Sequence, residues 1–189
     1  MARTETVTRI LYQFDELSES AKETARNWWR NSGDCWSWAS EWIASLQAFE
    51  RIAPIKVRSW DVDRADISVE WVGPHYALRY DHSDAIGELS GVRAYKWLHN
   101  NGWLDLAKRN VDGDCTLTGY CGDYPLFDPI AQYAKNPARI PELSQLFYEC
   151  AQSWVYAARE DMEYSYSDES IDENIRCNEY EFDESGNIA

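Results

Sequence analysis

The sequence has few basic residues, few glycines and prolines, and no long apolar run. Eighteen lysines and arginines stand against 33 aspartates and glutamates, so the formal net charge is -15 at pH 7. Proteins that bind nucleic acid or anionic lipid need clustered cations, and this composition disfavours both kinds of binding. Nine glycines and six prolines in 189 residues are too few for a collagen-like or low-complexity chain. No stretch reaches the roughly 18 apolar residues of a membrane-spanning helix.

Signals for export and for metal binding are also missing. Arg9 interrupts the apolar stretch near the N-terminus, so no signal-peptide core is predicted and we expect a cytoplasmic protein. The cysteines are odd in number and lack a repeated close spacing, which favours free thiols over a disulfide framework. Cys115 and Cys121 are separated by five residues and the histidines lie elsewhere, so we expect no metal site and no cofactor. The cysteines are Cys35, Cys115, Cys121, Cys150 and Cys177.

Aromatic residues are abundant instead, and ten of them are tryptophans. Two segments place apolar residues at helical spacing, which is typical of amphipathic helices that bury one face. Such aromatics could also stack on nucleic-acid bases, but the surrounding charge is mixed or acidic, and core packing is favoured. The two stripes are Ala21, Ala25, Trp28 and Trp29, and Trp38, Trp42, Leu46 and Phe49.

Strands and helices are both expected along the chain. Residues 6–12 predict a first strand, and three further strands joined by short turns suggest an antiparallel meander over residues 55–63, 67–72 and 75–80. Ser18 or Ser20 is expected to cap the first helix. The predicted helices run to about residue 31 from that cap, and over residues 36–53, 83–100, 125–134, 141–164 and 168–178.

These elements predict an α+β fold with a small, mainly antiparallel sheet packed by several amphipathic helices and a helical acidic C-terminal segment. Helices that carry Trp28, Trp42 and Trp97 are expected to cover one face of the sheet. The length fits a single domain over residues 1–164, with the acidic helix and tail of residues 165–189 packed on it.

Negative charge is concentrated at the C-terminal end. Residues 160–189 hold eleven acids and one base, Arg176, which is -10 in thirty residues. Part of this charge has a structural explanation, because Asp168 and Glu169 suit a helix N-terminus and a solvated acidic face aids solubility. The helix dipole does not explain the acids beyond residue 178, so contact with a cationic partner is the competing interpretation. The candidate partner-binding residues are Asp168, Glu169, Asp172, Glu173, Glu179, Glu181, Asp183 and Glu184.

These acidic side chains are expected to be exposed. Replacing Asp168, Asp172 and Glu173 together by lysine should then slow association with the partner and leave melting nearly unchanged. Binding should also weaken as salt rises, because exposed charges act over about 8 Å at 0.15 M ionic strength.

No catalytic motif is complete in this sequence. Paired carboxylates or a thiol with a histidine base could in principle do chemistry, but none lies in a local signature. No glycine-rich phosphate loop follows a strand, and residues 112–119 resemble a calcium loop only superficially. We therefore expect a protein that is not an enzyme. The candidates weighed are Asp61, Asp63 and Asp66, and Cys115 or Cys121 with His75 or His99.

Both ends of the chain carry longer motifs. Residues 12–26 read YQFDELSESAKETAR, and SDE at 167–169 is followed by NEYEFDESG at 178–186. These blocks resemble the opening and the ending of small acidic phage and prophage accessory proteins, some of which are labelled antitoxins. LTGYCGD at 117–123 with DPI at 128–130 is similar to a block in some members. The matching blocks cover roughly a quarter of the chain.

The resemblance implies a mobile-element accessory protein in a bacterial host cell. One hypothesis is a non-enzymatic inhibitor of a CRISPR- or restriction-type defence complex, whose acidic surface mimics phosphates. The alternative is an antitoxin that binds a co-encoded toxin, and a second alternative is a small phage enzyme that acts on nucleotides. In the first two cases the partner is a host defence or toxin protein with a cationic surface, and neither nucleic acid nor a membrane is bound directly.

Overall fold

The structure, a computed structural model, describes residues 9–32, 37–74 and 83–189 and divides into two compact units. The two ends of the chain, Met1–Ser37 and Met162–Ala189, form one unit, which we call the terminal unit. Trp38–Asp161 form the other, the central unit. The fold is α+β, as the sequence predicts. The division differs from the predicted one, because the N-terminal helix belongs with the acidic C-terminal segment and not with the central residues.

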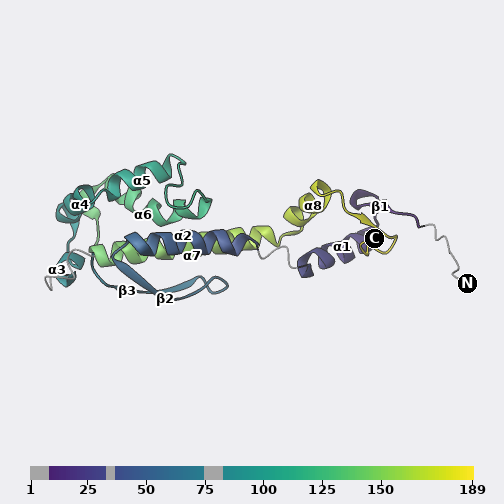
Figure 1. The fold of residues 1–189 in the computed structure, drawn as a ribbon, viewed down its shortest axis with the longest axis horizontal. Helices are drawn as coiled ribbons and strands as arrows, with labels where there is room; N and C mark the ends of the chain where they lie inside the picture. The colour runs from purple at the N-terminus through teal and green to yellow at the C-terminus, as the bar shows by residue number, and fades with distance from the viewer. Residues whose placement is uncertain (1–8, 33–36, 75–82) are drawn as a thin grey trace, which may run out of the picture. The chain divides into compact units, whose positions relative to one another are not determined.

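The terminal unit pairs the two ends of the chain (Figure 1). Strand β1 (Tyr12–Gln13) runs antiparallel to β4 (Glu181–Phe182), and a short 3-10 turn, η1 (Phe14–Glu16), leads toward α1 (Glu19–Asn31). The Ser18 hydroxyl caps α1 by accepting from the amide of Ala21. Helix α8 (Asp168–Cys177) packs on α1 and is capped by Ser167, whose hydroxyl accepts from the amide of Ser170.

The terminal unit has its own apolar core. Ile171 and Ile175 are fully buried and anchor α8 in this core. Trp28 packs edge-on against Tyr180 and Phe182, with ring centroids 5.1 and 6.0 Å apart. The buried members of this core are Phe14, Leu17, Ala21, Ala25, Trp29, Ile171, Ile175 and Phe182.

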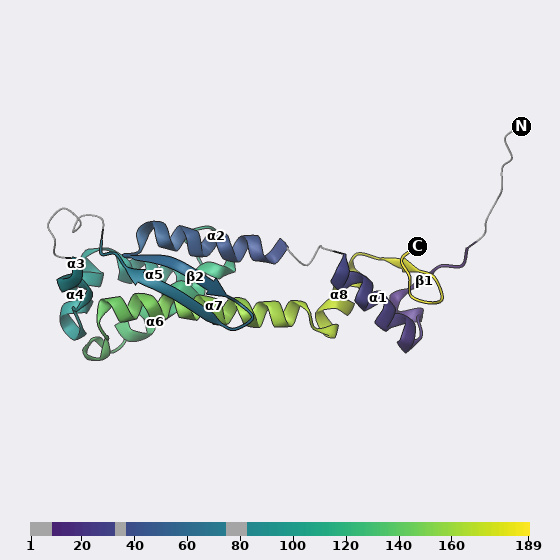
Figure 2. The same ribbon diagram turned by 90° about the horizontal axis from the view of Figure 1, so that it is seen from below.

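The central unit has three layers (Figures 1 and 2). Helices α2 (Ser37–Ile52) and α7 (Leu143–Ser165) lie side by side in the middle. The antiparallel hairpin of β2 (Ile55–Asp61) and β3 (Asp66–Trp71) covers one side. Shorter helices cover the other side. They are α4 (Gly91–Asn100), α5 (Trp103–Val111) and α6 (Tyr124–Ala134). Helix α3 (Ser83–Gly87) precedes α4 in the chain, and the 3-10 turns η4 (Cys121–Asp123) and η5 (Pro137–Arg139) precede and follow α6.

An aromatic cluster fills the space between these layers. The ring of Phe49 on α2 lies 5.8 Å from Trp103, 5.5 Å from Phe127 and 6.2 Å from Phe147. Trp154 on α7 contacts Trp42 and Trp60, so α2, α7 and the hairpin share one core. Core packing is thus confirmed for Trp28, Trp42 and Trp97, whose ring meets Phe147. They do not cover a single sheet face, because Trp28 lies in the terminal unit.

Two predicted elements differ from the structure, and a third cannot be compared with it. The first strand is confined to Tyr12–Gln13 in the described part of the chain, and the predicted strand over residues 75–80 lies outside the described residues. The predicted helix over residues 83–100 is two helices. Gly91 has φ +57° and its amide donates to the Ile140 carbonyl at 2.9 Å, a geometry that a continuous helix does not allow. Helix α5 was not predicted, although Trp103 and Ala107 are a buried i, i+4 pair.

Candidate functional site

The predicted site divides into acids that hold the terminal unit together and acids that do not. Asp172 belongs to the first group. Its two carboxylate oxygens accept from Nε and Nη2 of Arg26 at 2.7 and 2.8 Å, and both side chains are about 85% buried, with 15% and 14% exposed. This paired geometry is the strong form of an arginine-carboxylate contact. The hydrogen bond with Asp172 is the largest cause that raises the pKa of Arg26.

Asp168 adds a second ion pair between α8 and α1, with Arg30. Its carboxylate also lies 3.8 Å from Nη1 of Arg26. Arg176 pairs with Asp15 at 2.9 Å and lies over the ring of Phe14, as Arg26 does. The ion pairs therefore fasten α8 to α1 and η1. The predicted exposure of Asp172 is wrong, since the side chain is covered by α1 from the other end of the sequence.

Asp183 also has a structural role. One of its oxygens accepts from the amides of Ser185 and Asn187, both at 2.9 Å, and the Asn187 side chain donates to the carboxylate as well. The Asn187 side chain is the largest cause that lowers the pKa of Asp183. Asp183 thus closes the turn after β4, and its carboxylate is occupied by the chain itself.

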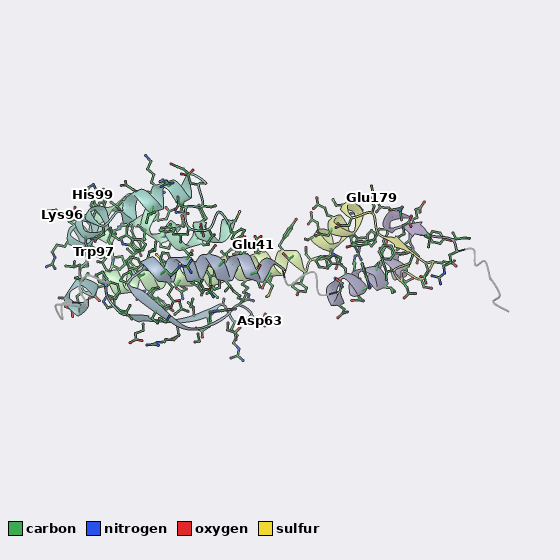
Figure 3. The ribbon with its side chains drawn as sticks, viewed as in Figure 1. Glu41, Asp63, Lys96, Trp97, His99 and Glu179 are labelled. Carbon is green, nitrogen blue, oxygen red and sulfur yellow. The ribbon has the colours of Figure 1, made fainter. Side chains whose placement is uncertain are left out.

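The other acids of the predicted site are five glutamates, and all are exposed. Within the described part of the chain no ion pair involves any of them, in contrast to Asp168 and Asp172. They come from three consecutive parts of the chain, namely α8, the short turn between α8 and β4, and the β4 strand with the turn that follows it. Glu179, labelled in Figure 3, adopts the left-handed backbone conformation with φ +53° between α8 and β4. The five are Glu169, Glu173, Glu179, Glu181 and Glu184.

The carboxylates weighed for catalysis lie at the tip of the β2-β3 hairpin. Asp61 accepts from the amide of Arg64 at 3.1 Å and pairs with its side chain at 3.6 Å, so it shapes the turn. Asp61 and Asp66 are paired residues at the end of the ladder. Asp63 is exposed at the tip (Figure 3). These contacts give Asp61 a structural role in the hairpin turn, and no catalytic role is needed to explain its position.

The thiols weighed for catalysis lie in one loop between α5 and α6. Burial, then the nearby Cys121, Asp123 and Asp114, raise the pKa of Cys115. A thiol nucleophile needs the opposite shift, because the thiolate is the reactive form. His75 lies outside the described residues, and in the described part of the chain no hydrogen bond joins His99 to either thiol.

The same loop contains a buried polar network that the sequence did not reveal. Asp123 is fully buried and accepts from the amides of Leu117 and Thr118 and from the Thr118 hydroxyl, at 2.8 to 2.9 Å. The Thr118 hydroxyl also contacts Ser45 on α2. Asn110 on α5 binds Thr116 through both ends of its amide. All these groups are satisfied, so the network fixes the loop to α2 and α5.

A depression of about 360 Å³ lies between α2 and β2 of the central unit. Its charged groups are already engaged. Glu50 accepts from the amide of Val57 at 3.0 Å and pairs with Lys56 at 2.8 Å, and Arg58 pairs with Glu70. The depression therefore offers no free acid or base.

Among residues 9–32, 37–74 and 83–189, no three His, Cys, Asp or Glu side chains are placed to hold a metal ion, and Cys115, Cys121, Cys150 and Cys177 are free thiols. None of the helices described is both long and apolar enough to cross a bilayer.

Comparison with known proteins adds no relative: no family model, no curated protein and no solved structure matches this chain.

Proposed function

We propose that this chain is a non-enzymatic inhibitor, encoded by a phage or prophage, that binds a nucleic-acid-handling defence complex of the CRISPR or restriction type. The partner would present a cationic surface, and the exposed glutamates of the terminal unit would take the place of phosphates on it. The observation that supports this most is the set Glu169, Glu173, Glu179, Glu181 and Glu184, exposed and without ion pairs among the described residues.

The internal ion pairs strengthen this proposal. Arg26, Arg30 and Arg176 are bound to Asp172, Asp168 and Asp15, so they do not screen the glutamates. Exposed charges of one sign steer a partner of the other sign and raise the association rate.

The experiment replaces Glu173, Glu181 and Glu184 together by lysine, and leaves Asp168 and Asp172 untouched. The tagged chain is used to isolate its partner from a bacterial host, and association of the purified pair is then measured at several salt concentrations. We expect the triple variant to associate about tenfold more slowly, and duplex DNA to compete with the parent chain for the partner.

A matched control reverses three exposed acids of the central unit, Glu41, Asp63 and Asp112, in the same way. The control changes the net charge equally, so it should keep most of the binding. Equal loss in both variants would show that only net charge matters. A captured toxin that does not bind nucleic acid would contradict the defence-complex proposal and support the antitoxin alternative.

A further inference from the structure

Although the chain is acidic overall, α4 of the central unit carries a basic surface. Arg93, Lys96 and His99 follow one another at intervals of three residues and are all exposed. Side chains at this spacing are neighbours on a helix surface. Ala94 and Leu98 on the opposite side are fully buried. In Figure 3, Lys96 and His99 lie at the outer margin of α4. The ring of Trp97, by contrast, packs on Phe147 of α7, with ring centroids 6.4 Å apart.

A further basic residue comes from the turn that packs on α4. The turn η5 packs on α4, and the Gly91 amide at the start of the helix donates to the Ile140 carbonyl at 2.9 Å. Arg139, the neighbour of Ile140 in the chain, is exposed beside that end of α4. We call Arg93, Lys96, His99 and Arg139 the α4 basic face.

The charges of this face are not neutralised. Within the described residues no ion pair involves Arg93, Lys96 or Arg139, and α4 itself contains no acid. Glu88 and Asp105, the acids nearest to α4 in the described sequence, pair with none of them. The arginines of α1 and α8 behave differently, because they are held in ion pairs that stabilise the terminal unit. The basic face is therefore free to bind an anion.

We propose that the α4 basic face binds the phosphodiester backbone of nucleic acid carried by the partner complex. This inference rests on the proposed function for the identity of the partner, and it adds that the partner retains nucleic acid outside the surface that the glutamates occupy.

The spacing of charges favours phosphates over an acidic protein surface. Residues 93 to 99 span about 9 Å of helix, and one strand of a duplex carries a phosphate about every 3.4 Å along its axis. Two or three phosphates of one strand can therefore lie along Arg93, Lys96 and His99, whatever the base sequence is. An acidic protein must place its carboxylates specifically to achieve the same density. Arginine also binds phosphate with two parallel hydrogen bonds.

The net charge of -15 explains why such contact depends on the partner. Repulsion keeps free nucleic acid at a distance, so the intrinsic affinity of the basic face is low. Once the glutamates are bound to the partner, the effective concentration of the partner's nucleic acid at the α4 basic face is high. A second contact of low intrinsic affinity can then add to the overall affinity.

The experiment uses the full chain labelled with nitrogen-15 at low salt. Short single-stranded RNA, short duplex DNA and a poly-glutamate peptide of equal charge are titrated separately, and amide shifts are followed. We expect the nucleic acids to move amides of α4 and η5 selectively and to bind more tightly than poly-glutamate. The first two arms distinguish single strands from duplexes as the source of the phosphates.

The test variant is Arg93→Ala with Lys96→Ala, and the matched control is Arg51→Ala with Arg64→Ala, two exposed arginines elsewhere in the central unit. Loss of two phosphate contacts should make the slope of log affinity against log salt shallower by about 2 for duplex DNA, and the control should keep the parent slope. Absence of shifts on α4, equal loss in the control, or equal affinity for poly-glutamate would overturn the inference. Those results would leave the glutamate experiment above unaffected, so the two proposals fail separately.

Discussion

At the scale of single residues, the acids of the C-terminal segment have distinct roles despite their similar sequence context. Asp172 and Glu173 are neighbours on α8, yet the first is buried against Arg26 and the second is exposed. The difference arises from the helical period, which turns adjacent side chains by about 100° and directs one of them toward α1. Replacing Asp172 by lysine would therefore place two cations together and disrupt the packing of α8 on α1. Such a variant would not test partner binding alone.

The first prediction compares these two neighbours. Asp172→Asn should lower the free energy of unfolding by about 1.5–3 kcal/mol, because the Arg26 guanidinium loses a charged, doubly hydrogen-bonded partner. Glu173→Gln should change it by less than about 0.5 kcal/mol, as at an ordinary surface position. Urea unfolding of both variants measures the difference, and equal values would show that the Arg26 contact does not stabilise the terminal unit.

At the scale of elements, capped helices were predictable and their interruptions were not. Ser18 and Ser167 define the starts of α1 and α8 through local hydrogen bonds, which nearby residues determine. The break between α3 and α4 depends on the Gly91 contact with Ile140, which is 49 residues away in the chain. The turn after β4 likewise depends on α1, because Gly186 lies directly against its backbone.

A second prediction concerns this turn. A Cβ atom on Gly186 would lie 2.0 Å from the carbonyl oxygen of Ala21, whereas one on Gly119 would meet nothing within 4 Å. Both glycines have φ +86°, so their backbone strain on substitution is matched. Gly186→Ala should therefore lower the melting temperature more than Gly119→Ala, since only the first forces the turn away from α1. Similar melting temperatures would show that the turn does not pack on α1 this way.

At the scale of the whole molecule, the chain has two cores. The chain passes from one unit to the other twice, at residues 37–38 and within α7. The terminal unit needs both ends of the chain, as Tyr12 pairs with Phe182 in its ribbon. The central unit has its own aromatic core around Phe49. Separate cores imply that one unit can open while the other stays folded.

A third prediction follows from the separate cores. Phe182→Ala removes a fully buried ring and should destabilise the terminal unit by about 3–5 kcal/mol. Hydrogen exchange should then quicken at amides of α1 and α8 and stay near the parent rate in α5 and α6. Phe127→Ala should give the opposite pattern. Uniform acceleration throughout the chain would mean that the two units unfold as one.

The sequence by itself determined the α+β class, most helices, the tryptophan-rich core and the acidity of the C-terminal segment. These depend on periodicity, capping residues and composition, which are local properties. Only the tertiary structure decided which acids are free. Arg26 and Asp172 are 146 residues apart, and no local pattern links them. The α4 basic face was hidden for a related reason: a net charge of -15 describes the average chain, whereas a binding surface depends on which side chains the fold leaves exposed together.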